Sequence, residues 1–436
     1  MPRIAMLSVH SSPLATLGGK ETGGMNVYIR ELSKELATKG FHIDIFTRSQ
    51  GASTPQITTC HKGVRIVHLK AGPEIPYDKS KVWFYLPEFL EGVQQFSQQE
   101  NLRYHLIHSH YWLSGWVGTK LSTHWNVPLL HMFHTLGHFK NKAIEPFGES
   151  EPAVRLEVET QLIKHAHHLV VASPREKVQM IWSYGIPSEK ISVIPCGVDS
   201  QLFIPHESFP SKTHLGLPPK RFILFVGRID PVKGIDTLLK AMALVKSKSE
   251  LHQEVHLLII GGEVDTTSSS HDKEMHRLQR LTSKLGLKNM VTFMGAQPQH
   301  QLPYFYSAAE VCVLPSRYES FGMVALEAMA CGTPVIASKV GGLTSFIQDE
   351  VNGFLVPEGD EKSLAEKIIT LLTNASLKET LGLLARRKTE AFSWSHIAYQ
   401  MTTLYHFLLK KKGDDTEEIV TIPFPLPERQ HALLTP

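Results

Sequence analysis

Two glutamates, Glu319 and Glu327, have a spacing that could serve chemistry. They lie in LPSRYESFGMVALEAMACGTPVIASKVGG, residues 314–342, where Ser320 is expected to cap a helix over 321–330. About six helical residues between them would hold the carboxylates about 9 Å or more apart along the helix axis. That separation is too wide for a shared proton and favours contacts to two hydroxyl groups of one extended ligand. An inverting glycosidase pair, with carboxyl groups roughly 6.5 to 9.5 Å apart, is the alternative.

Two cations, Arg228 and Lys233, come after an apolar segment in FVGRIDPVKGIDTLLKAM, residues 225–242. The pattern predicts a strand that ends at Gly227, a loop with both cations, and a helix that starts near Ile235. Ligands of α/β sheets bind at the carboxyl ends of the strands. A forked guanidinium and a mobile ammonium there could neutralise a diphosphate without a metal ion. Two solvated loop cations are the alternative.

Glycines form a third strand-to-helix turn, in SSPLATLGGKETGG before a helix expected from Met25 to Lys39. Gly23 and Gly24 would let backbone N–H groups approach an anion, and the helix N-terminus adds positive partial charge. The spacing matches neither GxGxxG nor GxxxxGK[ST], which disfavours a dinucleotide enzyme and a P-loop nucleotidase. A plain tight turn is the alternative.

Short β-branched segments that alternate with helical ones must position these residues. In the first half, strands are expected at 3–9, 42–47, 64–69, 105–109, 128–134, 168–173 and 191–194. In the second half, they are expected at 222–227, 255–260, 290–294, 311–314, 334–338 and 353–356, with helices at 235–246 and 361–373. The alternation predicts an α/β protein of two doubly wound domains.

The domain boundary is predicted from a Pro- and Ser-rich stretch between Asp199 and Arg221. The first domain would then be 1–203 and the second 204–390. A helix would come next at 391–411, and 412–436 would be a Pro-rich tail.

Composition limits the classes of partner. The 436 residues carry 45 Lys plus Arg and 42 Asp plus Glu, a net charge of +3 that favours neither a nucleic acid nor a membrane surface. No apolar run approaches the roughly 20 residues of a transmembrane helix. Four scattered cysteines indicate neither a disulfide framework nor a zinc module, so a cytoplasmic protein is expected. The histidine clusters at 108–110 and 165–168 lack partners at metal-ligand spacing, and no metal site is predicted.

These motifs together resemble one family. The Glu-x7-Glu motif, the Gly-Arg…Lys-Gly loop and TGGMNVYIREL occur in the order typical of the retaining glycosyltransferases of family 4, over about residues 3–405. SVHSSPLATLGGKETGGMNVYIREL and FHTLGHFKN are most similar to the D-inositol-3-phosphate N-acetylglucosaminyltransferases of that family, and DKSKVWFYLPEF to the sucrose-phosphate synthases. The resemblance implies the GT-B fold: two facing Rossmann-like domains, a cleft between them, and a C-terminal helix that crosses back to the first domain.

The resemblance also implies roles for single residues. The donor diphosphate would contact Arg228 and Lys233, the donor sugar Glu319 with the backbone of Phe321 and Gly322, and the ribose Glu327. Gly23 and Gly24 would border the reaction centre, and His134 would lie beside the donor sugar. The acceptor phosphate would be bound by Asn26, Lys79, Tyr111, Thr135, Lys140 and Arg155, with Lys81 as the alternative to Lys79. Without the resemblance, a structural imidazole and surface cations would explain these residues.

The implied reaction transfers glucose or N-acetylglucosamine from a nucleotide diphosphate sugar, such as UDP-glucose or UDP-N-acetylglucosamine, to inositol phosphate or fructose 6-phosphate. His134, Arg228, Lys233 and Glu319 would be the catalytic residues. Preorganised cations stabilise the departing diphosphate, so no cofactor is expected to be required and Mg²⁺ is not expected to be essential. No nucleophile is evident, and retention would then result from attack on the leaving-group face.

Other interpretations stay open at this point. The acceptor could be an unphosphorylated glycan or fructose. The protein could be a catalytically silent regulator that binds nucleotide sugars, or an epimerase of the same fold. Domain closure is expected, and a homodimer is compatible with the sequence.

Overall fold

An eight-stranded β-sheet organises the first half of the chain. The computed structural model describes residues 1–15, 22–144, 150–248, 254–262 and 270–414. The strands are β1 (Arg3–Leu7), β2 (His42–Arg48), β3 (Ile57–His61), β4 (Val64–Leu69), β5 (Leu106–His110), β6 (Leu129–Met132), β7 (His168–Val171) and β8 (Ile191–Val193). Their order is β3-β4-β2-β1-β5-β6-β7-β8, and only the β3–β4 pair is antiparallel.

A six-stranded parallel sheet organises the second half. Its strands are β9 (Arg221–Val226), β10 (Val255–Ile260), β11 (Val291–Gly295), β12 (Ala309–Leu314), β13 (Val335–Ser338) and β14 (Phe354–Val356), in the order β11-β10-β9-β12-β13-β14. The central strands are mostly apolar, as in RFILFV of β9, because helices cover both faces of such a sheet.

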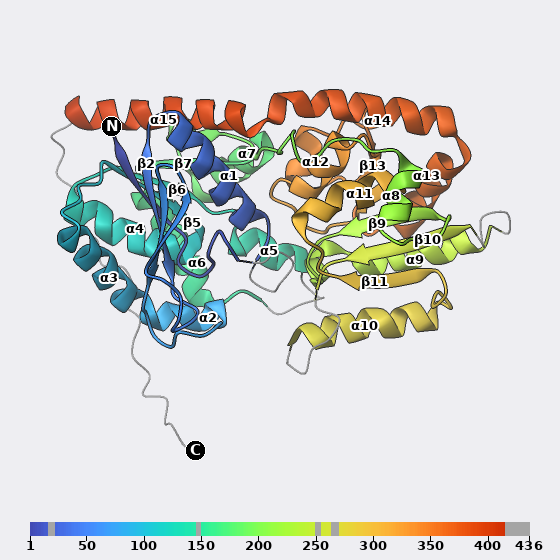
Figure 1. Ribbon diagram of the computed structural model, residues 1–436, viewed down its shortest axis with the longest axis horizontal. Helices are drawn as coiled ribbons and strands as arrows, with labels where there is room; N and C mark the ends of the chain where they lie inside the picture. The colour runs from blue at the N-terminus through green and yellow to red at the C-terminus, as the bar shows by residue number, and fades with distance from the viewer. Residues whose placement is uncertain (16–21, 145–149, 249–253, 263–269, 415–436) are drawn as a thin grey trace, which may run out of the picture.

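Helices cover both sheets (Figure 1). Those of the first half are α1 (Gly24–Thr38), α2 (Lys79–Val82), α3 (Leu86–Gln99), α4 (Tyr111–Trp125), α5 (Gly137–Ile144), α6 (Ala153–His165) and α7 (Pro174–Tyr184). Those of the second half are α8 (Ser208–His214), α9 (Ile235–Lys246), α10 (Ser270–Lys284), α11 (Leu302–Ala308), α12 (Met323–Ala330), α13 (Glu361–Thr373), α14 (Ala375–Thr389) and α15 (Trp394–Asp414). The predicted α/β class with two doubly wound domains is confirmed, and α9 and α13 have the predicted bounds.

One strand, β3, was not predicted from the sequence. It forms an antiparallel hairpin with β4, and Gly63 adopts a left-handed φ of 85° in the turn. The segment ITTCH is partly or fully exposed along its length at the sheet edge. An edge strand of this kind lacks the continuous apolar run that identifies the central strands.

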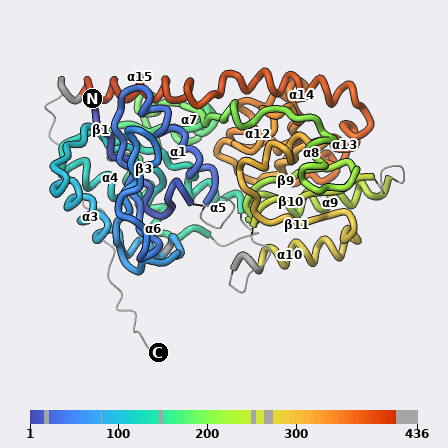
Figure 2. Tube along the Cα trace, in the orientation of Figure 1, coloured from blue at the N-terminus to red at the C-terminus, as the bar shows by residue number. Residues whose placement is uncertain are grey.

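The C-terminal helix α15 returns to the first domain, as the resemblance implies. It continues the line of α14 along one edge of the molecule and lies beside α1 (Figures 1 and 2). Tyr405 of α15 packs edge-on against Phe41 with ring centroids 5.5 Å apart, and its hydroxyl lies 2.8 Å from Nδ1 of the buried His108. The predicted tail beyond residue 414 lies outside the described residues.

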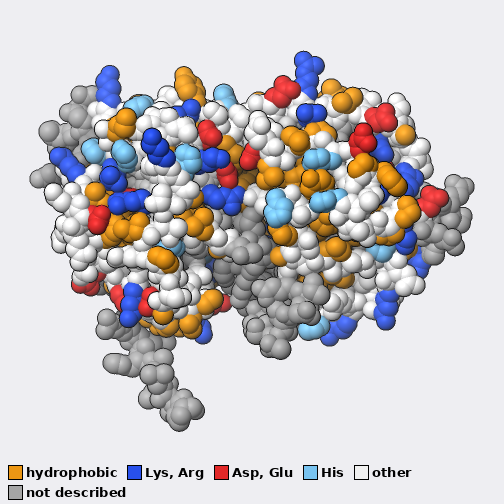
Figure 3. All heavy atoms as spheres, viewed as in Figure 1, with side chains coloured by type: hydrophobic (Ala, Val, Ile, Leu, Met, Phe, Trp, Pro, Cys, Tyr) orange, Lys and Arg blue, Asp and Glu red, His pale blue; other side chains and the backbone are white. Residues whose placement is uncertain are grey.

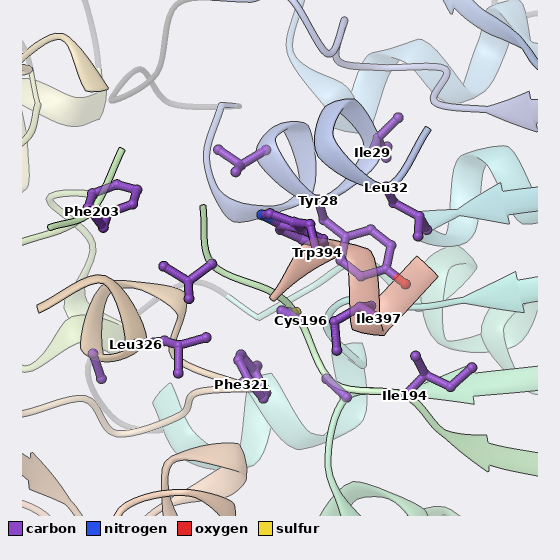
Figure 4. Packing of buried hydrophobic residues seen from close by; sticks show 14 of the residues in the cluster. Tyr28, Ile29, Leu32, Ile194, Cys196, Phe203, Phe321, Leu326, Trp394 and Ile397 are labelled. Carbon is purple, nitrogen blue, oxygen red and sulfur yellow. The ribbon is translucent and has the colours of Figure 1, made fainter. Parts of the chain in front are cut away.

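Apolar packing joins the two halves near the start of α15. Trp394 packs edge-on against Tyr28 of α1, with ring centroids 5.7 Å apart (Figure 4). Gly197 makes room for it, because a Cβ at residue 197 would lie 2.6 Å from the Trp394 ring. Phe321 from the second domain belongs to the same buried cluster. Side chains buried in this way contribute about 1.5 to 3 kcal/mol each.

The surface is mixed in charge. Lys and Arg side chains lie among Asp and Glu side chains over the face drawn in Figure 3. Within the described part of the chain, no helix combines the length and apolarity that crossing a membrane requires.

Candidate active site

A cavity of about 320 Å³ brings together all fifteen residues that the sequence analysis singled out. They are Gly23, Gly24, Asn26, Lys79, Tyr111, His134, Thr135, Lys140, Arg155, Arg228, Lys233, Glu319, Phe321, Gly322 and Glu327. Lys81, the alternative to Lys79, is exposed and does not line this cavity. Which ligand group each residue binds stays a prediction.

The cavity lies where the strand order reverses in both sheets. β1 is flanked by β2 and β5, and β9 is flanked by β10 and β12. Open α/β sheets bind ligands at such points, outside the carboxyl ends of the strands. The chain that leaves β5 and β6 presents Tyr111 and His134, and the chain that leaves β9 and β12 presents Arg228 and Glu319. Residues from both domains therefore face one space.

The two domains touch beside this cavity. Helix α5, at the junction of the two halves in Figure 2, contacts the short helix η3 (Pro231–Lys233), and α7 contacts η5 (Gly341–Ser345). Arg30 of α1 also donates a hydrogen bond of 2.6 Å from Nη2 to Oε1 of Gln299 in the second domain. The described conformation thus has the domains in direct contact.

The loop after β9 holds two cations on the cavity wall. Asp230 caps η3 by accepting a 3.0 Å hydrogen bond from the Val232 amide, which fixes the loop. Lys233 Nζ lies 2.5 Å from Oε2 of Glu319. Arg228 is more loosely paired, with Nη1 3.9 Å from Oδ2 of Asp230, and its side chain is 33% exposed. Arg228 therefore has donors to spare for an anionic ligand.

The prediction that Ser320 caps a helix over 321–330 is wrong. The helix α12 begins at Met323, and its N-cap is Gly322, whose φ is 102°. Ser320 Oγ instead donates a hydrogen bond to the carbonyl oxygen of His134, in the other domain. Ser320 therefore bonds to a distant residue in place of capping the nearby helix, and the turn before α12 forms part of the contact between the domains.

Two glycines that the sequence analysis did not single out support Glu319. Gly341 has φ 48°, and a Cβ there would lie 1.7 Å from the Glu319 carbonyl oxygen. The Gly342 amide donates a 3.0 Å hydrogen bond to the same oxygen. The signal for this cradle is the VGG sequence after β13, since paired glycines after a strand indicate a close backbone approach.

Glu327 occupies a different part of the cavity wall from Glu319. Its side chain is buried, and Oε2 accepts a 2.9 Å hydrogen bond from the Tyr306 hydroxyl. Burial raises the pKa of Glu327 to about 7, against the hydrogen bond from Tyr306 and the charge of Arg30. The two glutamates thus have separate partners, which favours two recognition contacts over a pair that shares a proton.

His134 is held in an unusual conformation. Its φ is 59°, in the left-handed region that non-glycine residues rarely adopt, and such conformations cluster at functional sites. Burial lowers the pKa of His134 to about 3, so the imidazole is neutral near pH 7. Nε2 of His134 lies 3.0 Å from Nδ1 of His110. A neutral ring can form hydrogen bonds with a sugar but cannot supply a positive charge.

Arg155 has several close partners on the first domain's side of the cavity. Nε donates to Glu159 at 2.7 Å, Nη1 to the Tyr111 hydroxyl at 2.9 Å, and Nη2 to the Thr135 carbonyl and hydroxyl at 2.8 and 3.1 Å. Nη1 also lies 2.8 Å from Oε2 of Glu151. The side chain of Arg155 is 1% exposed, so its partners rather than water satisfy it.

Glu151 is the functional candidate that the sequence analysis missed. Its Oε1 accepts a 2.7 Å hydrogen bond from Lys140 Nζ, so this one carboxylate bridges Lys140 and Arg155. A local signal exists, because Glu151, Arg155 and Glu159 recur at intervals of four residues, the spacing of helical ion pairs. Lys140 comes from another helix, and no local pattern predicts its part in the cluster.

Asn26 closes the glycine turn at the start of α1. Its Oδ1 accepts a 3.0 Å hydrogen bond from the Gly23 amide, and its Nδ2 donates to Ser11 Oγ and to the Ser12 carbonyl, both at 2.7 Å. These bonds hold Gly23 and Gly24 against the cavity. The side chain therefore has a positioning role in addition to any contact with an acceptor.

The arrangement can hold anions in two places. Arg228 and Lys233 line the second domain's side, and Lys140 and Arg155 line the first domain's side. Among the described residues that line the cavity, the carboxylates are Glu319 and Glu327. Glu319 pairs with Lys233, and Glu327 accepts a hydrogen bond from Tyr306.

Comparisons with known proteins match both halves. Residues 22–202 match the model "Glycosyltransferase Family 4", and residues 211–388 match "Glycosyl transferases group 1". A D-inositol 3-phosphate glycosyltransferase of Saccharomonospora viridis is 37% identical over 406 residues, which cover 92% of this chain and 93% of the relative.

Two solved structures also match this chain over more than nine tenths of its length. Sucrose-phosphate synthase from Thermosynechococcus elongatus is 38% identical, with a TM-score of 0.86, and the match covers 94% of this chain and 100% of that chain. HepE of Anabaena in complex with UDP and glucose is 22% identical with a TM-score of 0.74, covering 93% of this chain and 100% of that chain. This last match supports the fold alone.

Proposed function

The chain belongs to the group 1 glycosyltransferases of the inositol phosphate glycosyltransferase and sucrose-phosphate synthase type, and from this premise we propose that it transfers glucose or N-acetylglucosamine from a UDP-sugar to a phosphorylated polyol or sugar. The proposal includes retention at the anomeric carbon. The observation that carries it is one cavity with two groups of cations from different domains.

On the donor side, Arg228 and Lys233 bind the diphosphate. Within the described part of the chain, the ion-pair partner of Arg228 is 3.9 Å away, and Lys233 stands next to Glu319, so a diphosphate on the cations would bring the attached sugar to that carboxylate. Glu327, beside the Tyr306 hydroxyl, accepts hydrogen bonds from the ribose. The positive charges stabilise the diphosphate most strongly as it leaves, because its negative charge then increases.

On the acceptor side, Lys79, Lys140 and Arg155 bind the acceptor phosphate. All three line the cavity, and Tyr111 and Thr135 hold the guanidinium of Arg155 in place. The names of two relatives support a phosphorylated acceptor, since "D-inositol 3-phosphate glycosyltransferase" and "sucrose-phosphate synthase" each refer to a phosphorylated polyol or sugar.

The mechanism is inferred from the groups at the reaction centre. The two carboxylates of the cavity wall are engaged with Lys233 and Tyr306, and His134 is neutral. We infer that the acceptor hydroxyl attacks on the face that the diphosphate leaves, and that a diphosphate oxygen takes the hydroxyl proton. The cations supply the electrophilic assistance, so a divalent metal is not essential.

A coupled assay of nucleotide release tests the proposal. UDP-glucose, UDP-N-acetylglucosamine, ADP-glucose and GDP-mannose are each supplied with and without inositol phosphate, fructose 6-phosphate and fructose. Release that only a phosphorylated acceptor stimulates is expected, and proton NMR of the product should show the donor's anomeric configuration. Stimulation by fructose alone would refute the phosphate site, and donor binding without turnover would favour a silent regulator.

A further inference from the structure

One carboxylate contacts two of the three acceptor-side cations. Glu151 Oε1 lies 2.7 Å from Lys140 Nζ, and Oε2 lies 2.8 Å from Arg155 Nη1. The Glu151 amide donates a 2.7 Å hydrogen bond to Oδ1 of Asn141, which anchors its backbone, and its side chain is 9% exposed. An anion of the protein therefore already sits on the cations that the proposed function gives to an acceptor phosphate.

The hydrogen-bond inventory of Arg155 shows why this matters. A guanidinium has five N–H donors, and Arg155 donates four hydrogen bonds, to Glu159, to Tyr111, and to the carbonyl and hydroxyl of Thr135, while its Nη1 also forms an ion pair with Glu151. A phosphate can pair with this guanidinium only if one of these partners leaves. Glu159 is 1% exposed and also accepts the Gly137 amide, whereas Glu151 precedes α6 and is the more exposed of the two carboxylates.

We propose that Glu151 determines acceptor specificity: its carboxylate holds the place of a phosphate, and only an anionic acceptor group displaces it. The proposal rests on the proposed function, because it concerns the same acceptor subsite. A neutral hydroxyl cannot replace the carboxylate, since Lys140 would lose its ion-pair partner and Arg155, which is 1% exposed, would keep only Glu159.

The charges support an exchange of anions. Burial alone would raise the pKa of Glu151. The positive charges of Arg155, Lys140 and the nearby Lys79 outweigh burial and hold this pKa at about 2, so the carboxylate is ionised at neutral pH. Without Glu151, the three cations and Glu159 leave two positive charges. A phosphate monoester carries close to two negative charges at pH 7. It balances the cluster more fully than the single carboxylate that it displaces.

The substitution Glu151→Gln tests the idea, with Glu157→Gln on the exposed side of α6 as the matched control. Because charge-assisted hydrogen bonds are the strong ones, we expect KM for the phosphorylated acceptor to fall about tenfold in Glu151→Gln. The unphosphorylated counterpart should still stimulate no release in Glu151→Gln, and Glu157→Gln should match the wild type with both acceptors. If Glu151 only orders Lys140 and Arg155, KM for the phosphorylated acceptor will rise instead, which would overturn the proposal.

Calorimetry with inorganic phosphate separates this inference from the proposed function. Phosphate should bind about tenfold more tightly to Glu151→Gln, and to Glu151→Ala, than to the wild type, whatever acceptor the enzyme uses. Equal or weaker phosphate binding by both folded variants overturns the inference. Turnover with unphosphorylated acceptors alone refutes the proposed function, and the phosphate titration still decides the role of Glu151.

Discussion

Removal of the charge at Lys233 should slow the chemical step far more than it weakens donor binding. The substitution Lys233→Met keeps the length of the side chain and removes the ammonium. Lys233 and Glu319 are only 19% and 16% exposed, so the charge acts where water is partly excluded. At an effective dielectric constant of about 20, a unit charge about 4 Å from a developing anion contributes about 4 kcal/mol. Loss of one preorganised donor in other enzymes costs about 2.7 to 4 kcal/mol.

We therefore expect kcat to fall about 100- to 1000-fold. Steady-state nucleotide release with saturating acceptor measures it, and Lys240→Met, on an exposed position of α9, is the matched control. Loss of a partly exposed ion pair should cost at most about 1 kcal/mol of stability, so Tm should change little. A kcat within about fivefold of the wild type, with only KM raised, would refute the leaving-group role and leave Lys233 as a contact that binds substrate and transition state equally.

Three further results are expected. Burial raises the pKa of Glu327 from 4.5 to about 7, so the folded state binds more protons than the unfolded state between these values and stability falls as pH rises. Glu327→Gln should remove this slope, and an unchanged difference in Tm between about pH 5 and pH 8 would contradict the assignment. Gly341→Ala would place a Cβ 1.7 Å from the Glu319 carbonyl oxygen and should abolish turnover. The control Gly359→Ala, whose Cβ meets nothing within 4 Å, should lose only about 1 to 2 kcal/mol of stability and keep its turnover. Equal turnover in the two variants would refute the role of Gly341 in supporting Glu319. EDTA should leave at least half of the activity, and complete loss restored by Mg²⁺ or Mn²⁺ would refute metal independence.

The regular elements were predictable because their signal is local. Strands buried on both faces are mostly apolar, although β5 (LIHSH) is fully buried and carries polar residues, and the thirteen predicted strands are all present. The edge strand β3 carries no such signal, since much of it is exposed. Helix ends were less certain, because a cap depends on which partner its side chain finds. A serine before a helix is usually its cap, but Ser320 bonds to His134, 186 residues away in sequence.

The residues of the candidate site also differ in whether a local sequence pattern marks them. Arg228, Lys233, Glu319 and Glu327 stand in motifs that the sequence alone marks as chemical, and the fold brings them to one cavity. Glu151 carries only the four-residue spacing to Arg155 and Glu159, which indicates ion pairs along a helix and not a contact with Lys140. Its importance depends on Lys140, which another helix brings within 2.7 Å.

Both cation groups of the cleft hold a carboxylate of the protein. Lys233 pairs with Glu319, and Lys140 and Arg155 pair with Glu151. Buried charges without partners are costly, so these carboxylates stabilise the cleft, and ligand binding becomes an exchange of partners. Under the proposed roles the two sides differ in the fate of the carboxylate, because Glu319 remains and accepts hydrogen bonds from the donor sugar, whereas Glu151 yields its place to the acceptor phosphate. The proposed roles thus predict that the donor subsite selects for a sugar attached to the diphosphate and that the acceptor subsite selects for charge.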